Sequence, residues 1–180
     1  KNPSILMVTI KEVSSRKELR QFVRFATELY KDNPYYTPCL EFDEINTFDT
    51  KKNPALEHSK FANFLAYKDG KIVGRITAII NNLANEHWGC KKVRFGWFDF
   101  IDDYEVSKAL LDAVADWGRK NGMTAMNGPV GFTDFDHQGL LLEGYDYISP
   151  MISLYNYPYY VEHFDRYGLV KEADWIEFLV

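Results

Sequence analysis

The sequence predicts one α/β (α+β) domain, in which helices flank a central sheet that is mixed but mostly antiparallel. Asp69-Gly70 is a two-residue hairpin signal between two apolar runs. Residues 93–101 are apolar on both faces, which is typical of a central strand. Residues 102–121 then repeat apolar side chains at helical spacing, so a strand-helix-strand unit is expected.

The other expected elements follow from local patterns. Residues 7–13 alternate as a first strand, and Ser15 with Glu18 forms a capping box for a helix over 16–31. Asp102 is expected to cap the long helix. The remaining expected elements are an excursion with short helices over 34–60, strands over 61–67 and 72–80, a polar loop over 81–90, a strand over 123–130, a loop or broken helix over 133–144, an extended run over 148–154, a helix over 159–167 and a last strand over 173–180.

Composition and charge disfavour several classes of function. The chain has 180 residues, 46% of them hydrophobic, which is enough for one domain with a full core. The formal net charge is −5 and Lys and Arg form no cluster, which argues against nucleic acid and anionic membranes as partners. No apolar run approaches the roughly 20 residues of a membrane span. The aromatic content of 16% indicates a Phe-rich core or a broad groove.

The cysteines and the two ends of the chain lead to further expectations. Cys39 and Cys90 are isolated, so they make neither a disulfide framework nor a zinc site, and they suit a reducing cytoplasm. The sequence begins at Lys1 and stops at Val180 within an apolar run. We therefore expect a piece of a longer protein, truncated at its C-terminal end. The strand over 173–180 would then pair with a missing C-terminal half or cause self-association.

Three stretches resemble the GNAT superfamily of acyl-CoA-dependent N-acetyltransferases. They are Asp-Gly-Lys-Ile-Val-Gly at 69–74, the helix and Asn-Gly stop at 110–122, and Phe-Asp-Arg-Tyr-Gly-Leu-Val-Lys-Glu at 164–172. More narrowly, the Asn-Pro of 33–34 and the Asn-Tyr-Pro-Tyr-Tyr of 156–160 resemble one half of proteins with two such domains in tandem. The resemblance implies that strands 93–101 and 123–130 splay apart, and that a small-molecule amine is the acceptor.

The same resemblance implies that acyl-CoA, either acetyl-CoA or a longer one, binds as co-substrate between the splayed strands. The pantetheine arm would pair with backbone near Phe95, Gly96 and Trp97. The pyrophosphate would lie at the N-terminus of the long helix, where free N–H groups attract anions. Ser107 falls there on the second glycine of the family's phosphate loop.

The first turn of that helix departs from the family's pattern. Asp102 occupies the Arg/Gln position of the loop, Glu105 occupies the first glycine, and Asp103 adds a third carboxylate. Carboxylates at a helix N-terminus are ordinary caps. They also repel a pyrophosphate, because like charges about 4 Å apart cost about 1 kcal/mol in water and several near a surface. We therefore expect acetyl-CoA to bind weakly or not at all.

The candidate catalytic residues lie in the last third of the chain. The resemblance implies a tyrosine that protonates the leaving thiolate, but its position holds Phe164, and Tyr160 one turn earlier is the candidate general acid. Asn156 is expected to cap this helix. His137, beside Asp136, is the candidate base. Two plainer readings stay open: the tyrosines pack as aromatic surface, and His137 is a satisfied loop histidine.

The loop over 134–143 holds the densest polar chemistry. It faintly resembles a calcium loop, but Glu143 comes two residues early and residues 140–142 are apolar, so no metal site is predicted. We expect this loop and residues 155–160 to line one cleft, which would be the acceptor site.

Two functions remain open from the sequence. The first is a GNAT-like acyltransferase domain that transfers an acetyl or acyl group from acyl-CoA to an amine. The alternative is a non-catalytic GNAT-like half, acting as a scaffold or acceptor-binding platform for a missing catalytic half. The altered phosphate loop and Phe164 favour the alternative. A transferase that uses aminoacyl-tRNA is disfavoured by the acidic charge.

Overall fold

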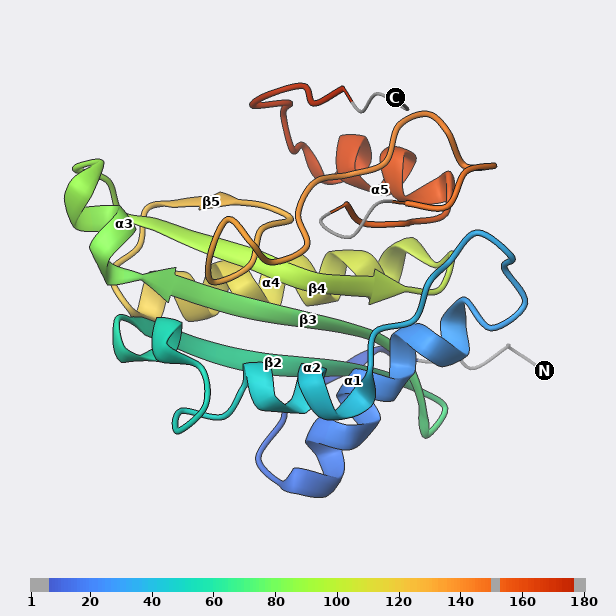
Figure 1. Cartoon of the computed structure of the whole chain (residues 1–180), viewed down its shortest axis with the longest axis horizontal. Helices are drawn as coiled ribbons and strands as arrows, with labels where there is room; N and C mark the ends of the chain where they lie inside the picture. The colour runs from blue at the N-terminus through green and yellow to red at the C-terminus, as the bar shows by residue number, and fades with distance from the viewer. Residues whose placement is uncertain (1–6, 150–152, 177–180) are drawn as a thin grey trace.

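A computed structural model describes residues 7–149 and 153–176, which form one sheet with helices on both faces (Figure 1). The strand order is β1-β2-β3-β4-β5. The strands are β1 (Thr9–Glu12), β2 (Ser59–Lys68), β3 (Lys71–Asn81), β4 (Lys92–Phe100) and β5 (Ala125–Asn127). The first four pair antiparallel and β5 pairs parallel to β4, so the mixed, mostly antiparallel sheet is confirmed.

The β2–β3 hairpin is the longest ladder of the sheet. Its turn residues Asp69 and Gly70 both have positive φ, 51° and 70°, as a two-residue turn of this hand requires. The ladder runs from the pair Lys68–Lys71 to the pair Ser59–Asn81. This rigid pair of strands holds β4, and through β4 the site described below.

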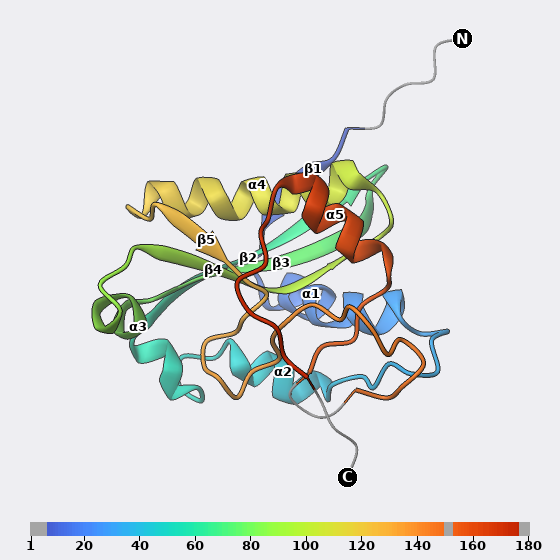
Figure 2. The same cartoon turned by 90° about the horizontal axis from the view of Figure 1, so that it is seen from above.

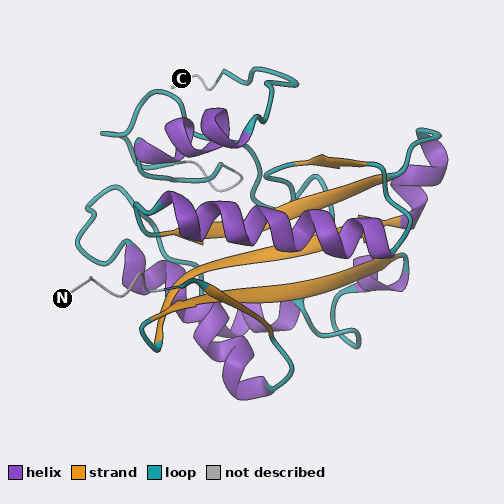
Figure 3. Ribbon diagram, turned by 180° about the vertical axis from the view of Figure 1, so that it is seen from behind, coloured by secondary structure: helices purple, strands orange, loops and turns teal. Residues whose placement is uncertain are grey.

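Helices cover the sheet in two layers, seen from above in Figure 2 and from behind in Figure 3. On one face lie α1 (Arg16–Leu29) and α2 (Glu41–Thr47), and on the other lie α4 (Tyr104–Lys120) and α5 (Tyr159–Tyr167). The connections also contain η1 (Pro54–Glu57) and α3 (Asn82–His87). None of the described helices is long and apolar enough to cross a membrane.

Close packing of α4 depends on a glycine of β3. A Cβ at Gly74 would lie 2.7 Å from Leu110 and 3.0 Å from Val106, two fully buried residues of α4. The helix therefore lies directly on the strand. On the opposite face, Phe22 of α1 packs against Phe48, which follows α2, with ring centroids 5.7 Å apart.

β4 and β5 part as the resemblance implies. Within the described residues they pair only over Lys92–Arg94 and Ala125–Asn127, and beyond this ladder the Val130 N–H donates a 2.9 Å hydrogen bond to the Phe95 carbonyl. β4 itself continues to Phe100. A bulge interrupts its pairing with β3 at Trp97, whose φ is 46°. The open end of the sheet therefore lies beside the second half of β4.

Two local expectations were wrong. The polar loop over 81–90 contains α3, which the Asn81 side chain caps by accepting from the Ala84 N–H at 2.9 Å. The cap of α4 is Asp103 rather than Asp102, because the Asp103 carboxylate accepts from the Glu105 N–H at 3.0 Å. Asp102 and Asp103 both fit the capping pattern, so the sequence alone does not show which of them is the cap.

The two last extended segments also differ from expectation. Within 148–154, the described residues show only an isolated bridge between Gln138 and Ser153, and residues 150–152 lie outside the described part. Residues 173–176 form no strand, and Ile176 is 76% exposed. The rest of that expected strand, residues 177–180, lies outside the described residues. Alternation of side chains predicts a strand, but a strand also needs a neighbour to pair with.

Candidate active site

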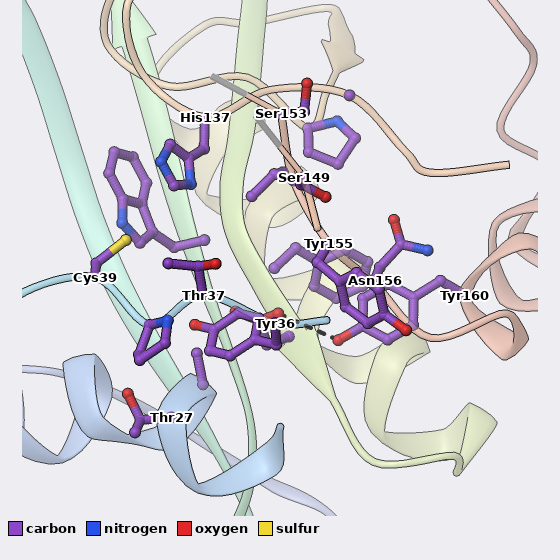
Figure 4. Close-up of a pocket in the computed structure, with 18 of the residues that line it drawn as sticks. Thr27, Tyr36, Thr37, Cys39, His137, Ser149, Ser153, Tyr155, Asn156 and Tyr160 are labelled. Atoms are coloured by element: carbon purple, nitrogen blue, oxygen red, sulfur yellow. Dashed lines mark hydrogen bonds between the residues drawn. The ribbon is translucent and has the colours of Figure 1, made fainter. Parts of the chain in front are cut away.

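A cavity of about 470 Å³ lies where β4 runs on beyond β5 (Figure 4). Its walls come from the helices α1, α2 and α5, the connection from α1 to α2, the strands β3 and β4, and the segments around 137–140, 148–149 and 153–156. The polar groups of the lining include Tyr36, Cys39, Glu44, His137, Asn156 and Tyr160. The volume suits a small molecule, and apolar walls with a few polar groups are typical of ligand sites.

The predicted cleft between the 134–143 loop and residues 155–160 is confirmed. Both segments line the cavity, and Asn156 joins them. Its side-chain oxygen accepts from the Leu141 N–H at 2.7 Å, and its nitrogen donates to the Leu141 carbonyl at 3.2 Å. The expectation that Asn156 caps α5 was therefore wrong: the cap position is Pro158, and the Asn156 amide is used to hold the loop.

A buried ion pair forms the floor of the cavity. Arg75 of β3 donates from Nε to Asp99 of β4 at 2.8 Å, and its Nη1 donates to the Phe22 and Val23 carbonyls at 3.1 and 3.3 Å. Burial opposes the charge on Arg75, but the carboxylates of Asp99 and Glu44 outweigh it and raise the pKa of the guanidinium. The floor of the cavity therefore holds a buried guanidinium that is paired with the Asp99 carboxylate and bonded to two backbone carbonyls.

Two tyrosine hydroxyls lie against Asp99. Tyr30, the C-cap residue of α1, donates to the Tyr160 oxygen at 2.7 Å, and the two hydroxyls lie 3.1 and 3.3 Å from the same Asp99 oxygen. The Phe100 N–H also donates to Tyr160, at 3.2 Å. Burial raises the pKa of both tyrosines well above its ordinary value, and Asp99 adds to the rise. Both hydroxyls therefore keep their protons at neutral pH.

His137, the candidate base, and Phe164, which stands where a general-acid tyrosine was expected, lie in different environments. His137 lines the cavity at its edge and is exposed. Asp136 accepts from the Thr133 N–H at 2.8 Å, so its carboxylate closes its own turn. Phe164, at the family's tyrosine position, packs in the core with its ring centroid 5.7 Å from that of Phe98.

Of the three β4 residues expected to pair with the pantetheine arm, Phe95 and Gly96 lie against Val130, and Trp97 lines the cavity. The Phe95 carbonyl accepts from Val130, and a Cβ at Gly96 would lie 2.6 Å from the Val130 carbonyl oxygen. Trp97 lines the cavity, and its indole N–H points to both carboxylate oxygens of Glu44 at 3.2 Å. The pairing with pantetheine stays a prediction for this stretch.

Ser107 lies in a buried chain of polar groups between α4 and α5. Its hydroxyl is 2.7 Å from Nδ1 of His163 and donates to the Tyr104 carbonyl at 3.1 Å. Nε2 of His163 lies 3.0 Å from an Asp102 carboxylate oxygen. Because Ser107 is fully buried, this chain of groups joins two helices, and the expected role of Ser107 at a phosphate stays a prediction.

Two cations that the sequence did not indicate lie near the first turn of α4. Lys68, at the end of β2, forms an ion pair with Asp103. The Arg166 guanidinium of α5 lies over the Tyr104 ring, 3.8 Å from its centroid. Both cations are distant from α4 in sequence, so only the fold brings them here. Glu105 remains exposed at the position where a pyrophosphate would lie.

We expect acetyl-CoA to bind this chain more weakly than micromolar, because Glu105 repels the pyrophosphate. Replacing Glu105 with Gln should tighten binding about fivefold, which corresponds to about 1 kcal/mol. Calorimetric titration measures this. Asp116→Asn, an exposed carboxylate near the other end of α4, is the matched control and should change nothing. A micromolar dissociation constant for the unmodified chain would contradict the expectation.

A sequence signal for the cavity floor existed but was missed. Arg75 and Asp99 each interrupt an apolar strand, and charged residues are seldom fully buried unless they are paired. Two opposite charges in neighbouring central strands therefore indicate a buried pair. Tyr30 gave no such signal, because it lies 69 residues from Asp99 in the sequence and fits an apolar helix face equally well.

No protein-family model matches this chain, but its sequence is similar to those of two curated proteins. It is 35% identical to Protein YghO of Escherichia coli (strain K12) over 160 residues, which are 89% of this chain and 41% of the relative. It is 30% identical to the bacterial ceramide synthase of Caulobacter vibrioides over 164 residues, 90% of this chain and 42% of the relative. The chain therefore spans about two fifths of the length of these relatives.

Solved structures resemble the chain in fold at low sequence identity. A predicted acetyltransferase with acetyl-CoA from Clostridium acetobutylicum has a TM-score of 0.57 at 10% identity, covering 96% of both chains. An aminoglycoside acetyltransferase from a soil metagenome, in complex with sisomicin, has a TM-score of 0.55 at 12% identity, covering 97% of this chain and 95% of the other. A tandem GNAT protein from the clavulanic acid biosynthesis pathway has a TM-score of 0.50 at 12% identity, and the match covers 67% of this chain and 37% of the other. As the three sequence stretches predicted, the chain has the GNAT fold.

Proposed function

We propose that this chain is an acyltransferase domain that moves an acyl group from acyl-CoA to an amine. The observation that carries the proposal is the cavity beside the open end of β4, which brings His137, Asn156 and Tyr160 to one place on a GNAT fold. Proteins of the same fold have been solved with acetyl-CoA and with the aminoglycoside sisomicin. Those structures support both substrate classes.

A long-chain amine is the acceptor that one relative and the cavity favour. One relative is named a bacterial ceramide synthase, and a ceramide is the amide of a fatty acid and a long-chain amino alcohol. Making that amide means acylating an amine, which is the chemistry proposed here. Much of the cavity wall is apolar, as an alkyl chain requires; this wall includes Val23, Ala26, Pro38, Leu140, Ile148 and Leu154.

In the proposed reaction, the neutral amine nitrogen attacks the thioester carbonyl. An N–C bond forms, the C–S bond breaks, and one proton moves from nitrogen to sulfur. His137 takes the proton from the nitrogen as general base, and Tyr160 gives a proton to the leaving thiolate as general acid. Asn156 holds the loop that carries His137. Tyr30 and Asp99 keep the Tyr160 hydroxyl in place at 2.7 and 3.3 Å.

Amine-dependent release of CoA tests the proposal. The chain is incubated with an acyl-CoA and either dodecylamine or sisomicin, free thiol is followed with a chromogenic reagent, and the amide is identified by mass spectrometry. We expect His137→Gln to lower the rate about 10²-fold, and His87→Gln, on α3 outside the cavity lining, to leave it unchanged. CoA release that is equal with and without amine would contradict acyl transfer.

One set of observations favours the alternative, an acceptor-binding half that does not itself bind acyl-CoA. Glu105 is exposed at the phosphate end, and Phe164 takes the place of the family's tyrosine. The catalytic half would be supplied by another domain. In that case dodecylamine binds this chain but no amide forms at any acyl-CoA concentration, so the assay for amide separates the two functions.

A further inference from the structure

The described cavity lining carries an uncompensated negative charge. Two carboxylates, Glu44 and Asp99, and one guanidinium, Arg75, line it. Arg75 is committed to Asp99, with both Nε and Nη2 2.8 Å from the same carboxylate oxygen, whereas its Nη1 is 3.8 Å from Glu44. That longer separation exceeds a hydrogen bond. Glu44 therefore contributes the charge in excess.

Glu44 also has hydrogen-bonding capacity to spare. Its side chain is 17% exposed, both of its oxygens lie 3.2 Å from the Trp97 indole nitrogen, and the Cys39 thiol also hydrogen-bonds to it. A carboxylate offers about four acceptor sites, so an incoming group with several N–H donors can still bind it. An ammonium group has three such donors.

The groups around Glu44 respond to its charge. Burial raises the pKa of the Cys39 thiol to about 11, and the Glu44 carboxylate adds to the rise. Burial and then the Asp99 carboxylate raise the pKa of Tyr36, and Arg75 opposes this. Both groups are therefore neutral at pH 7. With Arg75 matched to Asp99, the surroundings of Glu44 favour a cation.

We propose that Glu44 anchors the acceptor as an ammonium ion and so makes the cavity selective for long-chain amines over alcohols of equal length. This inference rests on the proposed function, because it names the substrate class of the same site. The ammonium would bind the Glu44 carboxylate beside the Tyr36 and Trp97 rings, whose faces attract cations. The alkyl chain would lie along the apolar wall. One proton must then leave the ammonium before the nitrogen attacks.

Calorimetric titration with dodecylamine and with dodecanol at pH 7 tests the anchor without acyl-CoA. An alkyl ammonium is protonated at this pH, like a Lys side chain with a pKa of about 10.4. The unmodified chain should bind dodecylamine at least about tenfold more tightly than dodecanol, the usual effect of a hydrogen bond to a charged group. Equal affinity for the two would overturn the proposal, and this comparison needs no variant.

The variant Glu44→Gln should reduce the affinity for dodecylamine at least about tenfold and leave the affinity for dodecanol unchanged. Retained binding of dodecanol shows that the cavity has formed. Glu41→Gln is the matched control, because Glu41 lies on the same helix but bonds Arg24 outside the cavity, at 2.7 Å. An unchanged affinity for dodecylamine in Glu44→Gln, or an equal loss in Glu41→Gln, would overturn the proposal.

The anchor and the acyl transfer can fail separately. If dodecylamine binds through Glu44 but no amide forms, acyl transfer by this chain is contradicted, whereas the role of Glu44 in binding the ammonium is supported. If amide forms at the same rate and with the same KM for the amine in Glu44→Gln, the role of Glu44 in binding the ammonium is contradicted, whereas acyl transfer is supported.

Discussion

Replacing Asp99 with Asn should lower the free energy of unfolding by about 3–5 kcal/mol, because it leaves the buried Arg75 without its carboxylate partner. Arg75 is 6% exposed and Asp99 is 9% exposed, so bulk water solvates the unpaired guanidinium poorly once the carboxylate is gone. Urea unfolding monitored by tryptophan fluorescence measures the change from the shift of the midpoint at constant slope.

The matched control for that experiment is Asp116→Asn on α4. Asp116 forms an exposed pair with Arg119, and exposed pairs are worth roughly 0–1 kcal/mol. A loss of less than about 1 kcal/mol for Asp99→Asn would mean that Glu44, 3.8 Å from Arg75, is a sufficient partner alone. That result would contradict the assignment of the excess charge to Glu44.

Replacing Tyr160 with Phe should lower kcat for acyl transfer about 10²-fold or more, because the variant has no proton to give to the thiolate. Tyr167→Phe is the control on the same helix, since that hydroxyl donates to Asp112 at 3.0 Å outside the cavity lining. Tyr160→Phe also removes an acceptor from the Phe100 N–H, so its unfolding is measured alongside. A kcat within twofold of the unmodified chain would remove Tyr160 from the mechanism.

The pH dependence of kcat gives a second view of Tyr160. Its pKa is raised, so the protonated form, which is the acid, persists at a pH where an ordinary tyrosine has begun to ionise near 10. We therefore expect no fall in kcat from this group as the pH rises from 8 to 10. A fall with a midpoint near 9 that is absent in Tyr160→Phe would contradict a raised pKa.

Elements with strong local signals were predictable from the sequence. The Asp69-Gly70 turn needs positive φ at both residues, and α1 begins at the predicted Ser15 capping box. α5 has the predicted limits, because Gly168, with φ of 90°, ends it as the sequence indicated. These signals act over a few residues and need no knowledge of the fold.

What the sequence could not show depends on contacts between distant segments. Tyr30 and Tyr160 lie 130 residues apart, and their hydroxyls meet only because α1 and α5 both approach Asp99. Glu44 stands on a seven-residue helix with no buried residues, so nothing local marked it as part of a cavity. Asn156 was assigned to a cap because it precedes a helix, whereas its partner, Leu141, is 15 residues earlier.

Nuclear magnetic resonance of the ¹⁵N-labelled chain, titrated with dodecylamine, tests most directly whether the cavity beside β4 is the acceptor site. We predict that the largest shift changes fall on the Trp97 indole N–H and on the backbone amides of Tyr36, Thr37, Cys39 and residues 137–140. A second cavity of about 380 Å³, lined by residues that include Trp88 at the end of α3 and Asn127 of β5, offers an internal comparison. Shift changes confined to that second cavity, or spread evenly over the surface, would contradict the assignment of the acceptor site.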